Sequence, residues 1–153
     1  MVRQYVIDNN RSREKLGKLV NTITAEELNL VIYKEGLTIA AVLGHIAFWD
    51  ERRLVLLKKW KQKGVTPSGI TDDDVDPLNG ALSPFLLAIS PRQLAEMAIN
   101  TAEALDSDLE GISSDTITSL EKLGDRHALN RAIHRKAHLD EIEAFLKANR
   151  GKK

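Results

Sequence analysis

Residues 38–64, TIAAVLGHIAFWDERRLVLLKKWKQKG, predict the long helix around which the rest of the fold is expected to form. Their apolar residues recur every three or four positions and make a broad stripe, the pattern of an amphipathic α-helix. Thr38 is suited to cap the first turn, and Gly64 supplies the stop signal. The stripe consists of Ile39, Val42, Leu43, Ile46, Trp49, Leu54, Leu57 and Trp60.

The segments on both sides of this helix also follow a helical period. They predict main helices over about 3–22, 90–112 and 126–149, and a short helical segment that opens at the capping box Thr24–Glu27 and ends near Gly36. Ser90 and Pro91 are a strong start signal. The inward-facing residues of the outer helices are expected to be Val6, Leu16, Leu19, Val20, Ile23, Leu94, Met97, Ala98, Thr101, Leu105 and Leu109.

Two stretches are expected to be connections. Residues 64–84 are rich in Gly and Pro and predict a long loop with one helical turn at most. Its acidic run, TDDDVD at 71–76, lacks the spacing of an EF-hand and is interpreted as solvated. Residues 113–124 are expected to be a short connector. Four main helices with almost no β-alternation predict one all-α domain over residues 1–153, a four-helix bundle.

Composition narrows the class of protein. The 22 Lys and Arg residues balance the 22 Asp and Glu residues, so the basic excess typical of nucleic-acid binders is absent and no nucleic-acid partner is expected. The chain has no cysteine, which excludes disulfides, thiolate nucleophiles and zinc–thiolate sites. The first residues lack the apolar core of a signal peptide, and the longest apolar stretch stops at Asp50. A cytoplasmic location without membrane contact is therefore expected.

Three histidines are candidates for a metal site. His134 and His138 lie one helical turn apart, about 40° around the helix and about 6 Å along it, so both imidazoles can reach one ion. His45 lies in an apolar stretch, where it needs a partner: a metal, a carboxylate or a backbone carbonyl. His127 is too far along the helix from His138 and is expected in solvent. The pattern alone favours hydrogen-bonded or solvated histidines over a metal site.

Three short motifs resemble the DinB-like (YfiT-like) superfamily, which includes the mycothiol-dependent maleylpyruvate isomerases. The motifs occur in the family's order between about residues 10 and 146. They lie in GLTIAAVLGHIAFWDERR (36–53), DVDPLNGAL (74–82) and IHRKAHLDEIEAF (133–145), and the matching residues are Leu43, His45, Trp49, Asp50, Asp76, Asn79, His134, His138, Glu141 and Ile142. Many members have Trp in place of Leu37 and a small residue in place of Asp140, which puts the substrate in doubt more than the metal.

The resemblance implies that His45, His134 and His138 bind a divalent metal ion, with zinc, nickel, iron and manganese all compatible with three imidazoles. It also implies a low-molecular-weight thiol cosubstrate such as mycothiol or bacillithiol. The leading hypothesis is therefore a metal- and thiol-dependent transferase or isomerase acting on a small-molecule substrate. The alternatives are a metal-dependent hydrolase, and a non-catalytic bundle in which the ion or the histidine cluster alone supports the structure or the formation of a homodimer.

Several neighbours of the histidines have two interpretations. Glu141 is expected either to support a ligand imidazole or act as general base, or else to be solvated. Asp50 is a weaker candidate because it points about 140° away from His45. Trp49 is expected in the pocket wall or in the core. Arg131 and Arg135 could bind a substrate carboxylate, although an exposed position is the stronger expectation.

Overall fold

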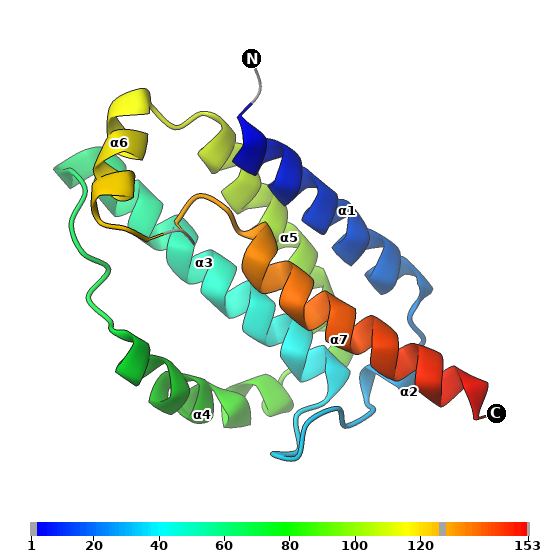
Figure 1. Cartoon of the computed structure of the whole chain (residues 1–153). Helices are drawn as coiled ribbons and strands as arrows, with labels where there is room; N and C mark the ends of the chain where they lie inside the picture. The colour runs from blue at the N-terminus through cyan, green and yellow to red at the C-terminus, as the bar shows by residue number, and fades with distance from the viewer. Residues whose placement is uncertain (1–2, 126–127, 153) are drawn as a thin grey trace.

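The computed structural model describes residues 3–125 and 128–152, and within these ranges all regular structure is helical apart from one isolated β-bridge between Val31 and Thr38 (Figure 1). The all-α prediction is confirmed. None of the described helices is long and apolar enough to cross a membrane. In chain order the helices are α1 (Gln4–Thr22), α2 (Ala25–Leu28), α3 (Ile39–Lys63), α4 (Asp72–Ala88), α5 (Pro91–Glu110), α6 (Ser114–Lys122) and α7 (Ala132–Gly151).

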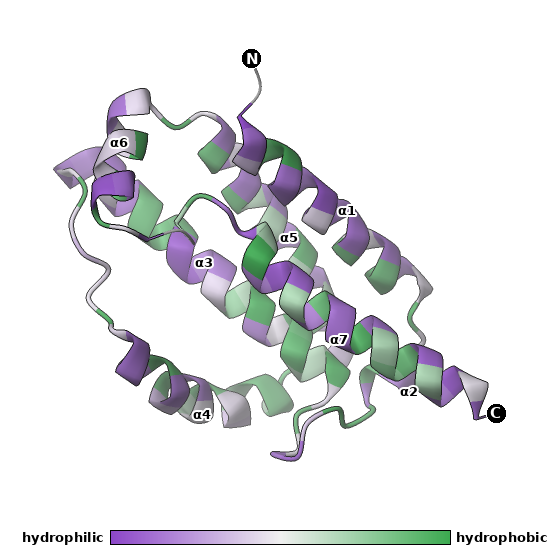
Figure 2. Cartoon of the chain, viewed as in Figure 1, coloured by the Kyte–Doolittle hydropathy of each residue, from purple (hydrophilic) through white to green (hydrophobic). Residues whose placement is uncertain are grey.

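Helix α3 is the central element of the fold. It packs along α5 and also contacts α4 and α7, while α1 packs against α5 and α7 (Figure 1). Hydrophilic residues lie along the outer side of α1, and α4 changes from hydrophilic at its start to hydrophobic at its end (Figure 2). The predicted caps of α3 and α5 are confirmed, because the Thr38 hydroxyl accepts from the Ala41 amide and that of Ser90 from the Gln93 amide.

The core consists of two hydrophobic clusters. The larger one takes residues from α1, α3, α5 and α7, including Leu16, Leu43, Leu94 and Leu139. The smaller one lies toward the other end of α3 and includes Leu57 with residues of α5 and α6. Each fully buried leucine contributes about 1.5–3 kcal/mol relative to an exposed one, so both clusters are major sources of stability.

Charged residues are buried near the boundary of the two clusters. The Arg135 guanidinium donates through Nε to Asp50 Oδ2 at 2.8 Å, and through Nη1 and Nη2 to the two oxygens of Asp106 at 2.9 and 2.8 Å. Arg131 Nε donates to the other Asp50 oxygen at 3.0 Å. The expectation that Arg131 and Arg135 are exposed is therefore wrong, because α3 and α5 supply carboxylates that allow both guanidinium groups to be buried.

Helix α3 approaches α4 and α5 closely at Gly44. A Cβ atom built on Gly44 would lie 2.6 Å from Leu94 Cδ2 and 2.8 Å from Leu86 Cδ2. A larger residue at this position would have to displace these two buried leucine methyl groups. The glycine lies directly beside His45, so the close packing fixes α3 where it carries the histidine.

Two expected connections are in fact helices. Most of the predicted loop at 64–84 belongs to α4, despite Pro77 and Pro84 within it. A capping box between Thr71 and Asp74 starts this helix, and Leu86 anchors it in the core. Likewise, the predicted connector at 113–124 contains α6, whose Leu120 is buried in the smaller cluster.

Two helix boundaries and one side chain also differ from the prediction. The Thr24–Glu27 capping box is confirmed, but α2 ends at Leu28 rather than near Gly36. Met97 is 39% exposed and does not face inward. Helix α7 begins at Ala132 rather than at 126, because its start is fixed by α1: Asn9 Oδ1 accepts from the amides of Arg131 and Ala132.

Candidate metal centre

His45 of α3 and His134 and His138 of α7 come together as one cluster. One ring nitrogen from each can be chosen so that all three lie within 4.8 Å of one another. The ring centroids are 4.8 to 5.2 Å apart, and Nε2 of His45 lies 3.2 Å from Nε2 of His134. Within the described part of the chain this is the one group of three or more potential metal ligands that meets such a criterion. The sequence prediction that these three residues converge is confirmed.

The buried charges position the two helices that carry the histidines. Asp50 lies five residues after His45 on α3, and Arg135 directly follows His134 on α7. Because the Asp50–Arg135 ion pair is fully buried, sliding α7 along α3 would break a charge-assisted contact in the core, at a cost of several kcal/mol. Asp50 thus faces Arg131 and Arg135 rather than an imidazole, consistent with its predicted direction away from His45.

Burial keeps two of the imidazoles, those of His45 and His138, in the neutral form that binds metals. Burial, reinforced by the nearby His138, lowers the pKa of His45 to about 4. Burial also lowers the pKa of His138, against the opposing effect of Glu141. At neutral pH the rings of His45 and His138 are therefore uncharged, and each has one nitrogen with a lone pair available to a metal ion.

The donor set fits a divalent ion. Two nitrogens bound to one tetrahedral zinc at about 2.0–2.1 Å lie about 3.3 Å apart, close to the separation between His45 and His134. Three protein ligands are also the number found in catalytic zinc sites, which keep a further position open, whereas structural sites are closed by four. These residues thus match the ligand count of a reactive metal centre.

Tyr33, which the sequence analysis missed, joins the cluster from the segment before α3. Its hydroxyl donates to Glu141 Oε2 and lies 3.4 Å from Nδ1 of His138. Burial raises the pKa of Tyr33, and the Glu141 carboxylate raises it further, so the phenol stays protonated. Nothing in the local sequence marks this tyrosine, because its contacts are more than 100 residues away along the chain.

A cavity of about 800 Å³ opens beside His45 and His134. It lies between α3, the segment leading into α4, and the end of α6, and both Trp49 and Asn79 line it. Trp49 Nε1 donates to Asn79 Oδ1 at 2.9 Å, which joins the walls formed by α3 and α4. The volume lies in the range of pockets for small ligands. Trp49 is thus part of the cavity wall, as one of its two interpretations predicted.

Other predicted residues have different surroundings. Asp76 is exposed and does not line the cavity. Arg131 does line it, but its guanidinium is held by Asp50. His127 lies outside the described residues.

Comparison with known proteins adds no relative: no family model, curated protein or solved structure matches the chain. The function is therefore inferred from the sequence motifs and from the geometry of the site.

Proposed function

We propose that the protein binds one divalent metal ion through His45, His134 and His138 and uses it in a transferase or isomerase reaction with a low-molecular-weight thiol. The observation that carries this proposal is the convergence of three ring nitrogens from two helices at the edge of a cavity large enough for a small molecule. The substrate would enter beside Trp49 and Asn79, which line that cavity.

The proposal includes membership of the DinB-like superfamily with its four-helix bundle. The order of the three motifs supports it. The packing of α1, α3, α5 and α7 also supports it, because α3 and α7 carry the histidines that the resemblance assigns to the metal. Asn79 of the second motif lies in the cavity wall, as a residue near the substrate would.

The chain's residues have separate roles in such a site. The neutral imidazoles of His45, His134 and His138 donate lone pairs to the ion. Three neutral ligands leave the charge of a bound divalent ion uncompensated, so that it favours the thiolate form of a thiol held beside it. The Trp49–Asn79 hydrogen bond fixes the wall of the cavity and keeps the indole oriented beside His45.

Glu141 acts by positioning a ligand in this proposal. The carboxylate accepts from Tyr33, whose oxygen lies next to Nδ1 of His138, and Glu141 does not line the cavity. Partners of this kind hold the orientation of a ligating imidazole and raise its basicity. A general base would instead need to reach the substrate inside the cavity.

An open coordination position favours a catalytic site over a purely structural one. A structural ion needs four protein ligands, and the described chain offers three at this place. A site that only stabilises the fold would also not require a cavity beside the ligands.

The thiol is tested by thermal denaturation of zinc-loaded and metal-free protein with mycothiol, bacillithiol or glutathione, beside the S-methyl derivative of each. Specific binding of a thiol to the folded protein raises the melting temperature by mass action. We expect this increase for at least one free thiol, only with metal present, and not for its S-methyl derivative. Metal-loaded protein that responds to none of the thiols contradicts their use, and protein that binds no metal contradicts the whole proposal.

A further inference from the structure

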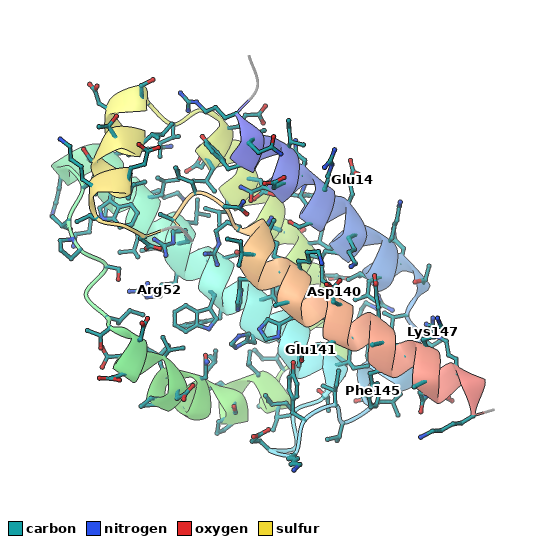
Figure 3. The ribbon with its side chains drawn as sticks, viewed as in Figure 1. Glu14, Arg52, Asp140, Glu141, Phe145 and Lys147 are labelled. Atoms are coloured by element: carbon teal, nitrogen blue, oxygen red, sulfur yellow. The ribbon has the colours of Figure 1, made fainter. Side chains whose placement is uncertain are left out.

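Arg52 projects into the cavity at a distance from the histidines. It lies seven residues after His45, on nearly the same face of α3 and about 10 Å further along the helix axis. Figure 3 shows its guanidinium in the space between α3 and the segment that leads to α4. The residue lines the cavity and is half-buried. Its Cζ atom is 5.9 Å from the centre of the Trp49 ring, which places the positive charge over the part of the cavity wall that Trp49 forms.

The arginines that line the cavity differ in their partners. Arg53 pairs with Asp125 at 3.1 Å, and Arg131 pairs with Asp50 at 3.0 Å. Arg52 donates from Nη2 to the carbonyl oxygen of Ser68 at 2.8 Å, and no carboxylate of the described chain lies within ion-pair distance of it. Burial lowers the pKa of Arg52. The negative charge of Asp125, which lies beyond ion-pair distance, opposes this effect. A guanidinium partly removed from water and without a carboxylate offers strong donors to a ligand.

A second donor in the same cavity, the indole N–H of Trp60, has no acceptor among the described residues. The Trp60 side chain is 3% exposed, and its Nε1 has no hydrogen-bond partner among the described residues. By contrast, Trp49 Nε1 donates a hydrogen bond to Asn79. Buried indole N–H groups usually find a partner, so an unused one in a cavity wall indicates that a ligand atom or water completes it.

We infer that the cavity binds a small organic carboxylate whose far end faces His45 and His134 and whose carboxylate is held by the guanidinium of Arg52. This inference rests on the proposed function for what lies at the histidine end, but the carboxylate subsite itself needs no metal. The planar fork of arginine matches a carboxylate, which a point charge such as lysine does only in part. The axial separation of about 10 Å requires several carbon atoms between the two ends of the ligand.

Arg52 also has a purely structural interpretation, in which its bond to Ser68 holds the segment before α4. The two interpretations differ in selectivity. A structural arginine affects all ligands of the cavity alike, whereas a carboxylate-binding arginine affects acids and leaves neutral analogues of the same length unchanged.

The test titrates zinc-loaded protein with ω-mercaptoalkanoic acids of increasing chain length and with the matching mercaptoalcohols, following the fluorescence of Trp49 and Trp60. We expect the wild type to bind acids roughly ten- to a hundredfold more tightly than alcohols at the best length, as a charge-assisted hydrogen bond allows. Arg52→Gln should abolish this preference and Arg52→Lys should retain part of it. Arg92→Gln, an exposed change outside the cavity, should leave it intact.

Metal content, measured on every sample, separates this inference from the proposed function. On metal-free protein the same comparison uses octanoate and octanol, and we expect the Arg52-dependent preference for the acid to persist. If the protein binds no metal but keeps this preference, the carboxylate subsite stands and the metal proposal fails. Equal binding of acids and alcohols by the wild type overturns the subsite. An Arg52→Gln variant that keeps the preference, or that weakens acids and alcohols alike, also overturns it.

Discussion

Arg135 and Asp50 form a buried ion pair across α7 and α3, with Nε of Arg135 2.8 Å from Oδ2 of Asp50 and neither side chain exposed to solvent. The pair lies one residue from His134 on α7 and five from His45 on α3. It therefore joins the two helices that carry the histidines close to where those histidines meet. Asp106 of α5 holds the other side of the same guanidinium, so three helices are fixed relative to one another.

Removing the Asp50 carboxylate should be strongly destabilising. Asp50→Ala leaves the guanidinium of Arg135 short of one partner in the core, and breaking a buried pair in this way costs about 3–5 kcal/mol. Chemical denaturation measures the loss, and Asp50→Asn serves if the alanine variant does not fold. The control is Lys136→Ala, which breaks the exposed pair with Asp140 and should cost about 1 kcal/mol or less. Equal effects of the two alanine changes would contradict the role given to the buried pair.

Two glycines in helices should respond in opposite directions to alanine. Gly44→Ala places a Cβ atom against the buried Leu94 and Leu86, and overpacking of this kind costs about 1–3 kcal/mol. Gly17→Ala meets nothing within 4 Å in α1 and should stabilise the protein by about 0.5–1 kcal/mol, because alanine restricts the unfolded chain. Thermal or urea denaturation of both variants checks the pair. A neutral or stabilising Gly44→Ala would show that α3 is not closely packed there.

The link between Glu27 and Arg150 predicts acid sensitivity. The hydrogen bonds from Arg150, and then the backbone amide of Thr24, lower the pKa of Glu27 from 4.5 to about 2. Since the unfolded chain takes up the proton first, the stabilisation is complete above about pH 4.5 and is lost as the pH falls toward 2.

Glu27→Gln should therefore cost about 1–2 kcal/mol at pH 7, as expected for losing a cap and a charge-assisted bond. The difference in unfolding free energy between variant and wild type should shrink between pH 4.5 and 2. Arg150 is half-exposed, so the measurement belongs at low ionic strength. A difference that does not change with pH would exclude the Glu27 carboxylate as its source.

Glu141 and Tyr33 should affect metal affinity more than stability. Glu141→Gln and Tyr33→Phe each weaken the contacts that orient His138, and partners of this kind typically change metal affinity by about 10–100-fold. Competition with a chelator measures the affinity. Glu143→Gln, two residues away on the exposed side of α7, is the matched control and should leave it unchanged. Loss of affinity in the control alone would point to a different position for the site.

The histidine cluster could be predicted because helical spacing and motif order can both be read from the sequence without the tertiary structure. His134 and His138 share a face of one helix whatever packs against it. His45 needed the resemblance, since a histidine in an apolar stretch has several ways to find a partner. Tyr33 could not be predicted, because its position next to His138 depends on how the segment before α3 folds back.

The missed elements also have physical reasons. Pro77, Gly80 and Pro84 are ordinary signals of a loop, but the capping box at Thr71 and the burial of Leu86 outweigh them in α4. The start of α7 depends on Asn9, a cap supplied by another helix rather than by the preceding residues. Arg135 has no acidic partner on its own helix face, so only the packed structure reveals that Asp50 and Asp106 bury it.

The central claim is that His45, His134 and His138 together bind one metal ion, and elemental analysis of metal per chain tests it most directly. Tag-free wild-type protein, incubated with zinc, nickel or manganese and then desalted, should retain close to one ion per chain. His138→Ala should lose it, while Lys147→Ala, an exposed change on the same helix, should retain it. Wild-type protein without a retained ion, or a His138→Ala variant that binds as much metal as the wild type, would contradict the claim.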